Sequence, residues 1–377
     1  MKDMYKSRIE RAKKQIAEHD LDCLLLYKPN NVAYYTGVIE DTACACVVMP
    51  AEGEPELVTL WYDVEWTRKR TDMKVVGWSM REGSIHDRIA RVVGEMGIAD
   101  GKFAFEADWM LHDQFQMLQT ALPNAKFLEG DDILRCTWIE DVRIYKTPEE
   151  VEKLRKSAEV ADLAMDAVLK VIKPGITGFD IAAEAEYVMK KHHSSTRTTA
   201  HPIMIAYGEL LHRPHPFIYS DKIENNGLIT IDFGAVIDGY HSDLARTIAL
   251  GKITKEDEMA VQAVLNGQTA GIQAIRPGVR LKYVHKAVLE GFGDYRKYHF
   301  GGLVGHSLGL GNGLQSFDIP YIDRDSELIL EKDMVWGFIE VSPFIPGVGA
   351  PRFEDAVVVT ENGAEVLSRY PRELIRI

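Results

Sequence analysis

Residues 231–243 read IDFGAVIDGYHSD, and this stretch places two aspartates, Asp232 and Asp243, inside a run of strand-forming residues. Aspartate is a poor strand former, and a buried carboxylate is costly unless it is paired or holds a metal ion. The Asp238-Gly239 pair at the centre is typical of a two-residue hairpin turn. The stretch therefore predicts a β-hairpin with one aspartate on each strand.

The register of this hairpin brings the two aspartates to one face. If the Asp238-Gly239 pair forms the turn, Gly234 lies opposite Asp243 and Asp232 lies opposite Ala245. Side chains alternate between the faces of a strand, so both carboxylates share a face as diagonal neighbours, with Cα atoms about 7–8 Å apart. Gly234 is expected to leave space beside them. Such a pair can bind metal, although solvated carboxylates on the outside of an edge hairpin would give the same pattern.

A weak internal repeat surrounds the hairpin. The segments AVLKVIKPGI (residues 167–176) and AGIQAIRPGV (residues 270–279) align without a gap. Each predicts a helix that a Pro-Gly pair ends, followed by a second helix. Chance recurrence of a common helix stop would give this pattern, whereas a duplicated αβ half would place an active site between two related halves.

The sequence KTPEE (residues 146–150) marks the best domain boundary. Its threonine can cap a helix, its proline suits the first turn, and the second glutamate completes a capping box, so a long helix is predicted to about Ile172. Upstream, apolar runs such as CLLLYKP and KVVGW alternate with helical patterns, which is typical of an α/β unit. We expect an N-terminal α/β domain over residues 1–143 and a second domain over residues 144–377.

The composition excludes some classes of function. With 46% hydrophobic and 27% charged residues the chain is typical of soluble globular proteins, and its formal net charge of −13 offers no basic surplus for nucleic acid or an anionic membrane. The first 20 residues predict an amphipathic helix rather than a signal peptide, and no apolar run is long enough to span a bilayer. A cytoplasmic protein is expected. The four cysteines form no C-x-x-C pair and are expected to be reduced thiols.

Three further stretches supply candidate metal ligands. His306 lies in the glycine-rich run GGLVGHSLGLGNG, whose spacing matches no phosphate-binding loop. Glu340 lies in the middle of the apolar run MVWGFIEVSPF, and Glu354 comes just before a strand in RFEDAVVV. Taken singly, a structural histidine and ordinary ion-pair residues are the commoner explanations. Together with the two aspartates of the hairpin they make four carboxylates and one imidazole.

A donor set rich in carboxylates suits hard divalent ions. Mn²⁺ or Co²⁺ is expected, with Fe²⁺ or Zn²⁺ as alternatives. Bridging carboxylates can hold two ions about 3.5–4 Å apart, which activate a shared water and polarise a carbonyl group. The donor set therefore allows a site for two divalent ions.

These motifs resemble those of the creatinase/prolidase/aminopeptidase P family, the M24 "pita-bread" metallopeptidases. IDFGAVIDGYHSDLART is similar to the family's D-x-G-…-G-Y-x-S-D-x-x-R-T, and GHSLGL, FIE and RFED follow in the family's order. PNNVAYYTG and the linker IYKTPEEVEKLRKSA resemble the N-terminal domain and hinge of the prolidase branch. The resemblance covers nearly the whole chain. It implies a creatinase/prolidase-type α/β domain, followed by a catalytic domain whose pseudo-twofold αβ halves surround a curved, mainly antiparallel sheet.

The resemblance also implies roles for single residues. Asp232 would chelate one metal ion, and His306 and Glu340 would bind the other. Asp243 and Glu354 would bridge the two ions, with a hydroxide between them as the nucleophile.

A histidine near the scissile bond is implied as well. His215 precedes Asp232 by the family's spacing for this residue, where it would hydrogen-bond the substrate or the developing oxyanion. On the residues alone, the surrounding HRPHP is also a turn-prone loop. His201 and His212 are further pocket candidates without an assigned role.

The stretch after GHSLGL departs from the family pattern. Prolidases continue into an H-E-x-P-R-like segment whose His and Arg hold the substrate, whereas this chain has the longer GNGLQSFDIPY, without that His or Arg. Arg352, with Arg213 and Arg324 as alternatives, is left to neutralise a substrate carboxylate. Val341 also replaces the usual Pro after the first catalytic Glu.

The leading hypothesis is a two-metal hydrolase that cleaves the amide bond of Xaa-Pro dipeptides or short peptides. A family member acting on a small non-peptide C–N compound, as ectoine hydrolases and creatinase do, is the alternative. A non-catalytic binding protein on the same fold is a third, against which the retention of all five ligands argues. Homodimers are usual among similar proteins, so a homodimer is expected. The native metal and the preferred substrate length are left open.

Overall fold

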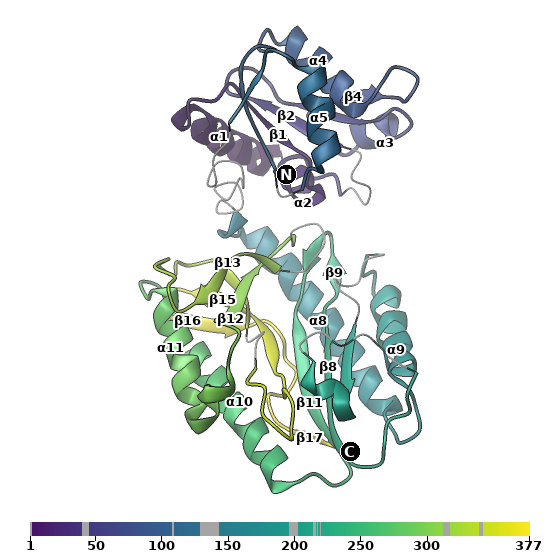
Figure 1. Ribbon diagram of the computed structural model, residues 1–377, viewed down its shortest axis with the longest axis vertical. Helices are drawn as coiled ribbons and strands as arrows, with labels where there is room; N and C mark the ends of the chain where they lie inside the picture. Colours follow the sequence, from purple (N-terminus) through teal and green to yellow (C-terminus); the bar gives the residue numbers. More distant parts are fainter. Residues whose placement is uncertain are drawn as a thin grey trace. The chain divides into compact units, whose positions relative to one another are not determined.

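A computed structural model gives the fold of the chain in two compact units, Met1–Val142 and Arg143–Ile377 (Figure 1). Among the described residues, no helix combines the length and the apolar character needed to cross a membrane. The structure describes residues 2–39, 45–107, 109–128, 143–195, 203–213, 216, 218, 220–311, 317–338 and 342–377.

The N-terminal unit is built on a mixed β-sheet. Its described strands run in the order β4-β3-β2-β1-β5-β6, in which β2 is antiparallel to both neighbours and the other pairs are parallel. Apolar side chains of the sheet and of α4 and α5 form one core, so the predicted α/β unit is confirmed. The strands are β1 (Cys23–Leu26), β2 (Cys46–Pro50), β3 (Glu56–Leu60), β4 (Lys74–Trp78), β5 (Lys102–Phe105) and β6 (Lys126–Phe127). The helices are α1 (Lys2–Glu18), α2 (Pro29–Thr36), α3 (Val64–Arg68), α4 (Ile85–Glu95) and α5 (His112–Ala121).

Two of the four cysteines can be placed. Cys23 and Cys46 are buried free thiols in adjacent strands, as expected, and burial raises the pKa of each well above its usual value. Cys44 and Cys136 lie outside the described residues.

Helix α2 is an element that the sequence pattern did not predict. Pro29 occupies its first turn and Gly37, with φ 75°, ends it. The buried carboxylate of Glu106 accepts hydrogen bonds from the backbone N–H groups of Tyr27 and Lys28 at its start. The residue that stabilises the start of this helix is therefore distant in sequence, and the local pattern alone could not show it.

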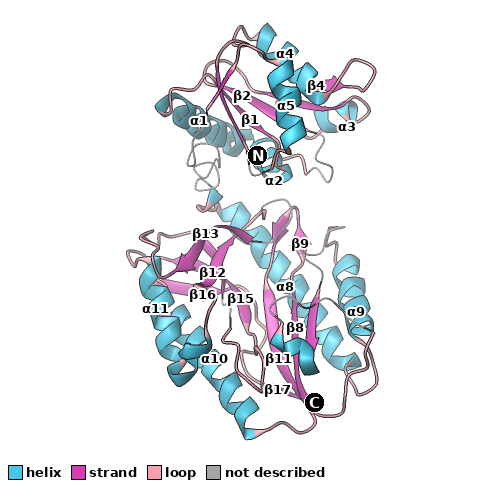
Figure 2. Ribbon diagram, in the orientation of Figure 1, coloured by secondary structure: helices cyan, strands magenta, loops and turns pink. Residues whose placement is uncertain are grey.

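The C-terminal unit is built on a curved, mainly antiparallel sheet (Figure 2). Its described strands run in the order β13-β12-β14-β15-β11-β8-β7, with β16 beside β15 and β17 beside β11. The strands of the main path are β7 (Met204–Tyr207), β8 (Gly227–Phe233), β11 (Leu244–Leu250), β12 (Leu303–Leu308), β13 (Phe317–Asp323), β14 (Val335–Phe338) and β15 (Glu354–Thr360). The others are β9 (Val236–Ile237), β10 (Tyr240–His241), β16 (Gly363–Val366) and β17 (Ile375–Arg376).

The helices confirm that the sequence repeat is a structural repeat. Gly175, between the first pair of helices, donates its N–H to Ile223 O at 2.9 Å, and Gly278, between the second pair, donates to Leu330 O at 2.8 Å. The first pair packs behind β8 and β11, and α11 of the second pair packs behind β12, β14 and β15. The pairs are α8 (Pro148–Val171) with α9 (Gly178–Lys191), and α10 (Lys255–Ala274) with α11 (Leu281–Gly291); short 3₁₀ turns are η1 (Gly208–His212) and η2 (Gly293–Tyr298).

Candidate metal centre

The predicted hairpin forms at the Asp238-Gly239 turn. Both residues have positive φ, 50° and 82°, as the tight turn between β9 and β10 requires. Ile237 pairs with Tyr240, and further along Asp232 pairs with Ala245 between β8 and β11. The register inferred from the sequence is therefore confirmed.

The expected space beside Gly234 is not there. A Cβ at this position would lie 1.9 Å from the backbone oxygen of Ser242. The glycine permits close approach of the two strands rather than access for a ligand, so that part of the prediction is wrong.

Three carboxylates meet on one face of the sheet. Ala245 pairs with Asp232 on β8 and with Glu354 on β15, so the two acids flank it on a shared face. Because the side chain of Ala245 is small, the carboxylate of Asp243 can lie between those of Asp232 and Glu354. Carboxylate oxygens of Asp232, Asp243 and Glu354 all lie within 4.8 Å of one another, and the residues are only 2%, 6% and 2% exposed.

His306 reaches this cluster from β12. Its Nδ1 lies 2.8 Å from the carbonyl oxygen of Ser307, which can only accept, so this nitrogen carries the ring hydrogen. Its Nε2 lies 3.2 Å from Oδ2 of Asp243, and the ring is buried. In a neutral imidazole two lone pairs then face each other, and they repel unless a proton or a metal ion lies between them.

Gly337 is a residue of the centre that sequence reasoning missed. It pairs with His306 across β12 and β14. A Cβ there would lie 2.7 Å from Cε1 of His306 and 2.9 Å from Oδ2 of Asp243. Only glycine therefore leaves room for these two side chains, and the signal that could have revealed it is a lone glycine inside the apolar strand VWGF.

Arg352 supplies part of the countercharge. Its Nη1 donates to Oδ2 of Asp232 at 2.7 Å, and its Nε lies 3.4 Å from Oε1 of Glu354. The guanidinium is nearly buried and is held by these two carboxylates. Its predicted contact with a substrate stays a prediction.

The other candidates divide into placed and unplaced residues. Arg324 is 77% exposed beside Asp325, and His212 is exposed at the end of η1. His215, Glu340 and His201 lie outside the described residues.

A small cavity lies beside the carboxylates. Arg213 and Pro216, on either side of His215 in the sequence, line it together with Asp232 and Arg352. The chain next to His215 thus contributes to the wall of the candidate centre.

The donor set fits divalent metal. Three buried carboxylates lie together beside Arg352, and a divalent ion would offset the cost of burying several acids in one place. Carboxylate oxygens with one imidazole nitrogen are ligands that hard and borderline divalent ions accept.

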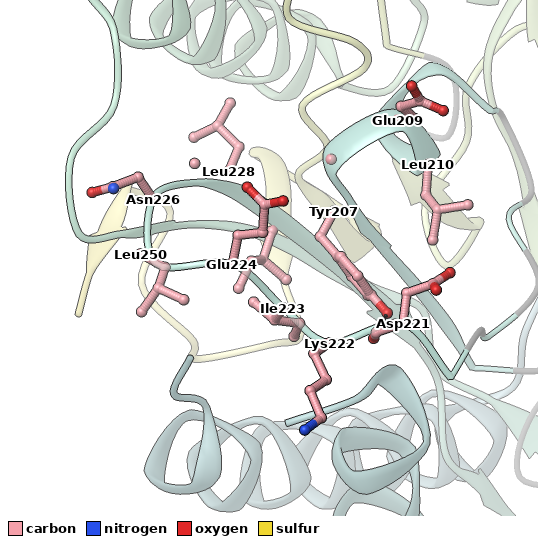
Figure 3. A pocket seen from close by; sticks show the side chains of 13 residues that line it. Tyr207, Glu209, Leu210, Asp221, Lys222, Ile223, Glu224, Asn226, Leu228 and Leu250 are labelled. Atoms are coloured by element: carbon pink, nitrogen blue, oxygen red, sulfur yellow. Dashed lines mark hydrogen bonds between the residues drawn. The ribbon is translucent and has the colours of Figure 1, made fainter. Parts of the chain in front are cut away.

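A second cavity of about 290 Å³ lies toward the other end of β8. Figure 3 shows Tyr207, Asp221 and Glu224 among the side chains that line it. Its acidic side chains are exposed, and none belongs to the cluster around Asp232. Solvated carboxylates of this kind need no ion, and we assign this cavity no role.

Comparisons with known proteins identify the family of both units. The model of metallopeptidase family M24 matches residues 152–361, and that of the creatinase/prolidase N-terminal domain matches residues 8–145. The Xaa-Pro dipeptidase of Pyrococcus furiosus is 30% identical over 98% of this chain and 100% of its own length. Among solved structures, the Xaa-Pro dipeptidase from Bacillus anthracis has a TM-score of 0.87 at 27% identity, covering 99% of this chain and 100% of that chain. The prolidase from Pyrococcus horikoshii OT3 has a TM-score of 0.85 at 25% identity over 98% and 100%.

Proposed function

The chain belongs to metallopeptidase family M24 and is a metal-dependent peptidase, and we propose that it hydrolyses Xaa-Pro dipeptides or short Xaa-Pro peptides with two divalent metal ions. The observation that carries the proposal is the buried cluster of three carboxylates beside an imidazole. The names of the similar proteins supply the substrate class.

We assign the ligands as follows. Asp232 would hold one ion, His306 and Glu340 would hold the other, and Asp243 and Glu354 would be shared by the two. The short contacts among the three described carboxylates, and between Asp243 and His306, support the bridging roles. The ions supply a water of lowered pKa and an electrophile for the scissile carbonyl.

The protein's own side chains prepare this chemistry. The Nδ1–H of His306 donates to Ser307 O, which leaves Nε2 as the ligand atom and fixes the ring. Arg352 orients Asp232 and Glu354 through its two contacts. His215 is proposed to donate a hydrogen bond to the substrate carbonyl oxygen as negative charge develops on it.

The metal requirement can be tested directly. Protein treated with a chelator should lose its peptidase activity, and titration with Mn²⁺ or Co²⁺ should restore it as about two ions bind per chain. Fe²⁺ and Zn²⁺ are the comparison ions. Full activity of verified metal-free protein would refute the proposal.

A second substrate class is favoured by the departure after GHSLGL. Asp318 pairs with Ser307 between β12 and β13, on the opposite face from His306, and its carboxylate is bound by the buried Arg143. It therefore points away from the carboxylate cluster and is neutralised within the protein. Because the prolidase-type His and Arg are absent, a small non-peptide C–N substrate, such as a cyclic or guanidino amide, is the alternative.

One panel of substrates separates the two classes. Metal-loaded protein is assayed on Xaa-Pro dipeptides, longer Xaa-Pro peptides, and cyclic and guanidino amides. We expect cleavage of Xaa-Pro bonds. Activity confined to the last group would replace the peptide proposal by the alternative, and two bound ions without turnover of any compound would favour a binding protein.

The proposal also covers the location and the oligomeric state of the enzyme. We propose a cytoplasmic homodimer, by analogy with similar proteins. Light scattering of the purified chain should give twice the monomer mass of 42.5 kDa. A mass of 42.5 kDa at working concentrations would contradict the dimer without affecting the metal centre.

A further inference from the structure

Arg246 lies on the face of the sheet opposite the candidate metal centre, and every N–H group of its guanidinium donates a hydrogen bond. The side chain is fully buried on β11, one residue after Ala245, and therefore on the face opposite the carboxylate cluster. It makes five hydrogen bonds of 2.8 Å, which saturate its five N–H groups. The acceptors are Pro371 O, Ala245 O, Glu354 O, Asp355 Oδ1 and Tyr370 O.

Gln268 binds the same segment from α10. Its Nε2 donates to Phe353 O at 3.1 Å and to Asp355 Oδ2 at 2.7 Å. The carboxylate of Asp355 is thereby held at both oxygens, by Arg246 and by Gln268. All three residues are essentially inaccessible to water.

The three consecutive residues 353–355 are thus held by hydrogen bonds from Arg246 and Gln268. Gln268 binds the carbonyl of Phe353, Arg246 binds the carbonyl of Glu354, and both bind the side chain of Asp355. The middle residue, Glu354, is the one whose side chain points to the carboxylate cluster. Arg246 also binds the carbonyl of Ala245, the residue between Asp232 and Glu354 in the sheet.

We infer that Arg246 and Gln268 are positioning residues of the metal centre, which hold the backbone of residues 353–355 so that Glu354 can bridge two ions. The inference rests on the proposed function. A bridging carboxylate must reach two ions with both oxygens, so a small shift of its backbone costs more than a shift of a terminal ligand. Outer groups that orient metal ligands typically contribute 10–100-fold to metal affinity.

Substituting Arg246 with Lys tests whether the planar guanidinium, rather than its charge alone, is required. Lysine keeps the positive charge beside Asp355 but has three donors on one nitrogen, too few to bind the four carbonyl oxygens and the carboxylate that Arg246 binds. We expect R246K to bind Mn²⁺ about 10–100-fold more weakly at one site, measured by calorimetric titration of metal-free protein. Q268M should weaken Mn²⁺ binding in the same direction but less, because Gln268 holds the neighbouring carbonyl rather than that of Glu354.

A double substitution of Arg246 and Asp355 tests the inference in case the single variant does not fold. R246M/D355L removes both buried charges together, which interiors tolerate better than the loss of one partner. This variant should fold, show weak Mn²⁺ binding and lose the electron paramagnetic resonance signal of a coupled Mn²⁺ pair. Two tightly bound, coupled ions in folded R246K or R246M/D355L would overturn the inference.

The chain offers a matched control. Arg143 and Asp318 form another buried Arg–Asp pair in the same unit, and the described contacts of Arg143 reach no carbonyl of a proposed ligand. R143K should therefore lower the unfolding temperature without changing Mn²⁺ affinity, whereas R246K changes both. If the wild-type chain itself bound no Mn²⁺, the proposed function would fail; if wild type and R246K bound it equally, only the inference would fail.

Discussion

Glu354 and Asp355 are adjacent in the chain, lie on opposite faces of β15, and have opposite electrostatic surroundings. Asp355 is bound by the guanidinium of Arg246 and the amide of Gln268, and burial raises its pKa because these contacts offset only part of the cost of desolvation. Glu354 lies with two more carboxylates, and in the described contacts the guanidinium of Arg352 reaches both Glu354 and Asp232. Among the described contacts, the rear face of β15, which carries Asp355, pairs its acid with Arg246. The front face, which carries Glu354, brings three carboxylates together beside the guanidinium of Arg352. Charge balance, rather than residue type or burial, therefore separates a structural acid from a candidate ligand.

The largest effect should come from removing a charge on the front face. Asp243→Asn keeps the shape of the side chain but takes away a bridging oxygen anion, and we expect peptidase activity to fall by about 10⁴-fold or more. Because the substitution also relieves repulsion among three buried carboxylates, metal-free D243N should unfold at a higher temperature than the metal-free parent. Turnover and metal-free thermal unfolding are the two measurements. Near-normal turnover would remove Asp243 from the centre.

The rear face should respond in the opposite way. Asp355→Ala leaves the guanidinium of Arg246 buried without its counter-ion, which is expected to lower the free energy of unfolding by about 3–5 kcal/mol. Urea unfolding of the metal-free protein measures this loss, and wild type and D243N are the references. An unchanged midpoint would show that the carbonyl acceptors alone satisfy Arg246, and the contrast between the two faces would then be smaller than the contacts suggest.

Gly337 tests the space between the two groups on the front face. A methyl group at this position meets both His306 and Asp243, so Gly337→Ala should weaken Mn²⁺ binding by about 10-fold or more as these groups move apart. Gly94→Ala in α4 is the matched control, because no atom lies within 4 Å of its added Cβ. That substitution should leave metal binding unchanged and stabilise the helix by up to about 1 kcal/mol. Equal Mn²⁺ affinities of the two variants would mean that His306 and Asp243 can accommodate a methyl group at Gly337 without losing the metal.

The sequence predicted best what depends on local spacing. The turn at Asp238-Gly239 and the alternation of strand side chains sufficed to bring Asp232 and Asp243 to one face. The capping box of Thr147 and Glu150 likewise marked the start of α8, where the structure finds it. The assignment of metal ligands relied on the family resemblance, and the roles of single residues stay predictions.

What the sequence could not show are contacts between distant segments. The match of Arg246 to the carbonyls of Tyr370 and Pro371 spans more than a hundred residues, and nothing in either segment indicates it. Gly234 was expected to make space, but the opposite strand fills that space, since a pairing register does not give the separation of two backbones. The contact of Arg352 with Asp232 could not be predicted either, because it joins two segments that are far apart in the sequence.

Glu106 in the N-terminal unit extends the comparison to a buried acid without a guanidinium. Its carboxylate accepts N–H groups of Tyr27, Lys28 and Asn31 at the start of α2, and burial raises its pKa to about 6 from a usual value of 4.5. The folded state therefore holds a proton up to about pH 6, whereas the unfolded chain releases it near 4.5. Because the folded state binds more protons in this interval, its stability should fall as the pH rises through it, by about 2 kcal/mol in all.

Amide hydrogen exchange over residues 23–37 of the full chain, corrected for the intrinsic pH dependence of exchange, measures this smallest effect. Protection should decrease between about pH 4.5 and 6 in the wild-type chain and stay constant in Glu106→Gln, which has no titrating proton. A decrease that persists in E106Q would place the titrating group elsewhere and leave Glu106 as a hydrogen-bonding cap whose ionisation does not matter to α2.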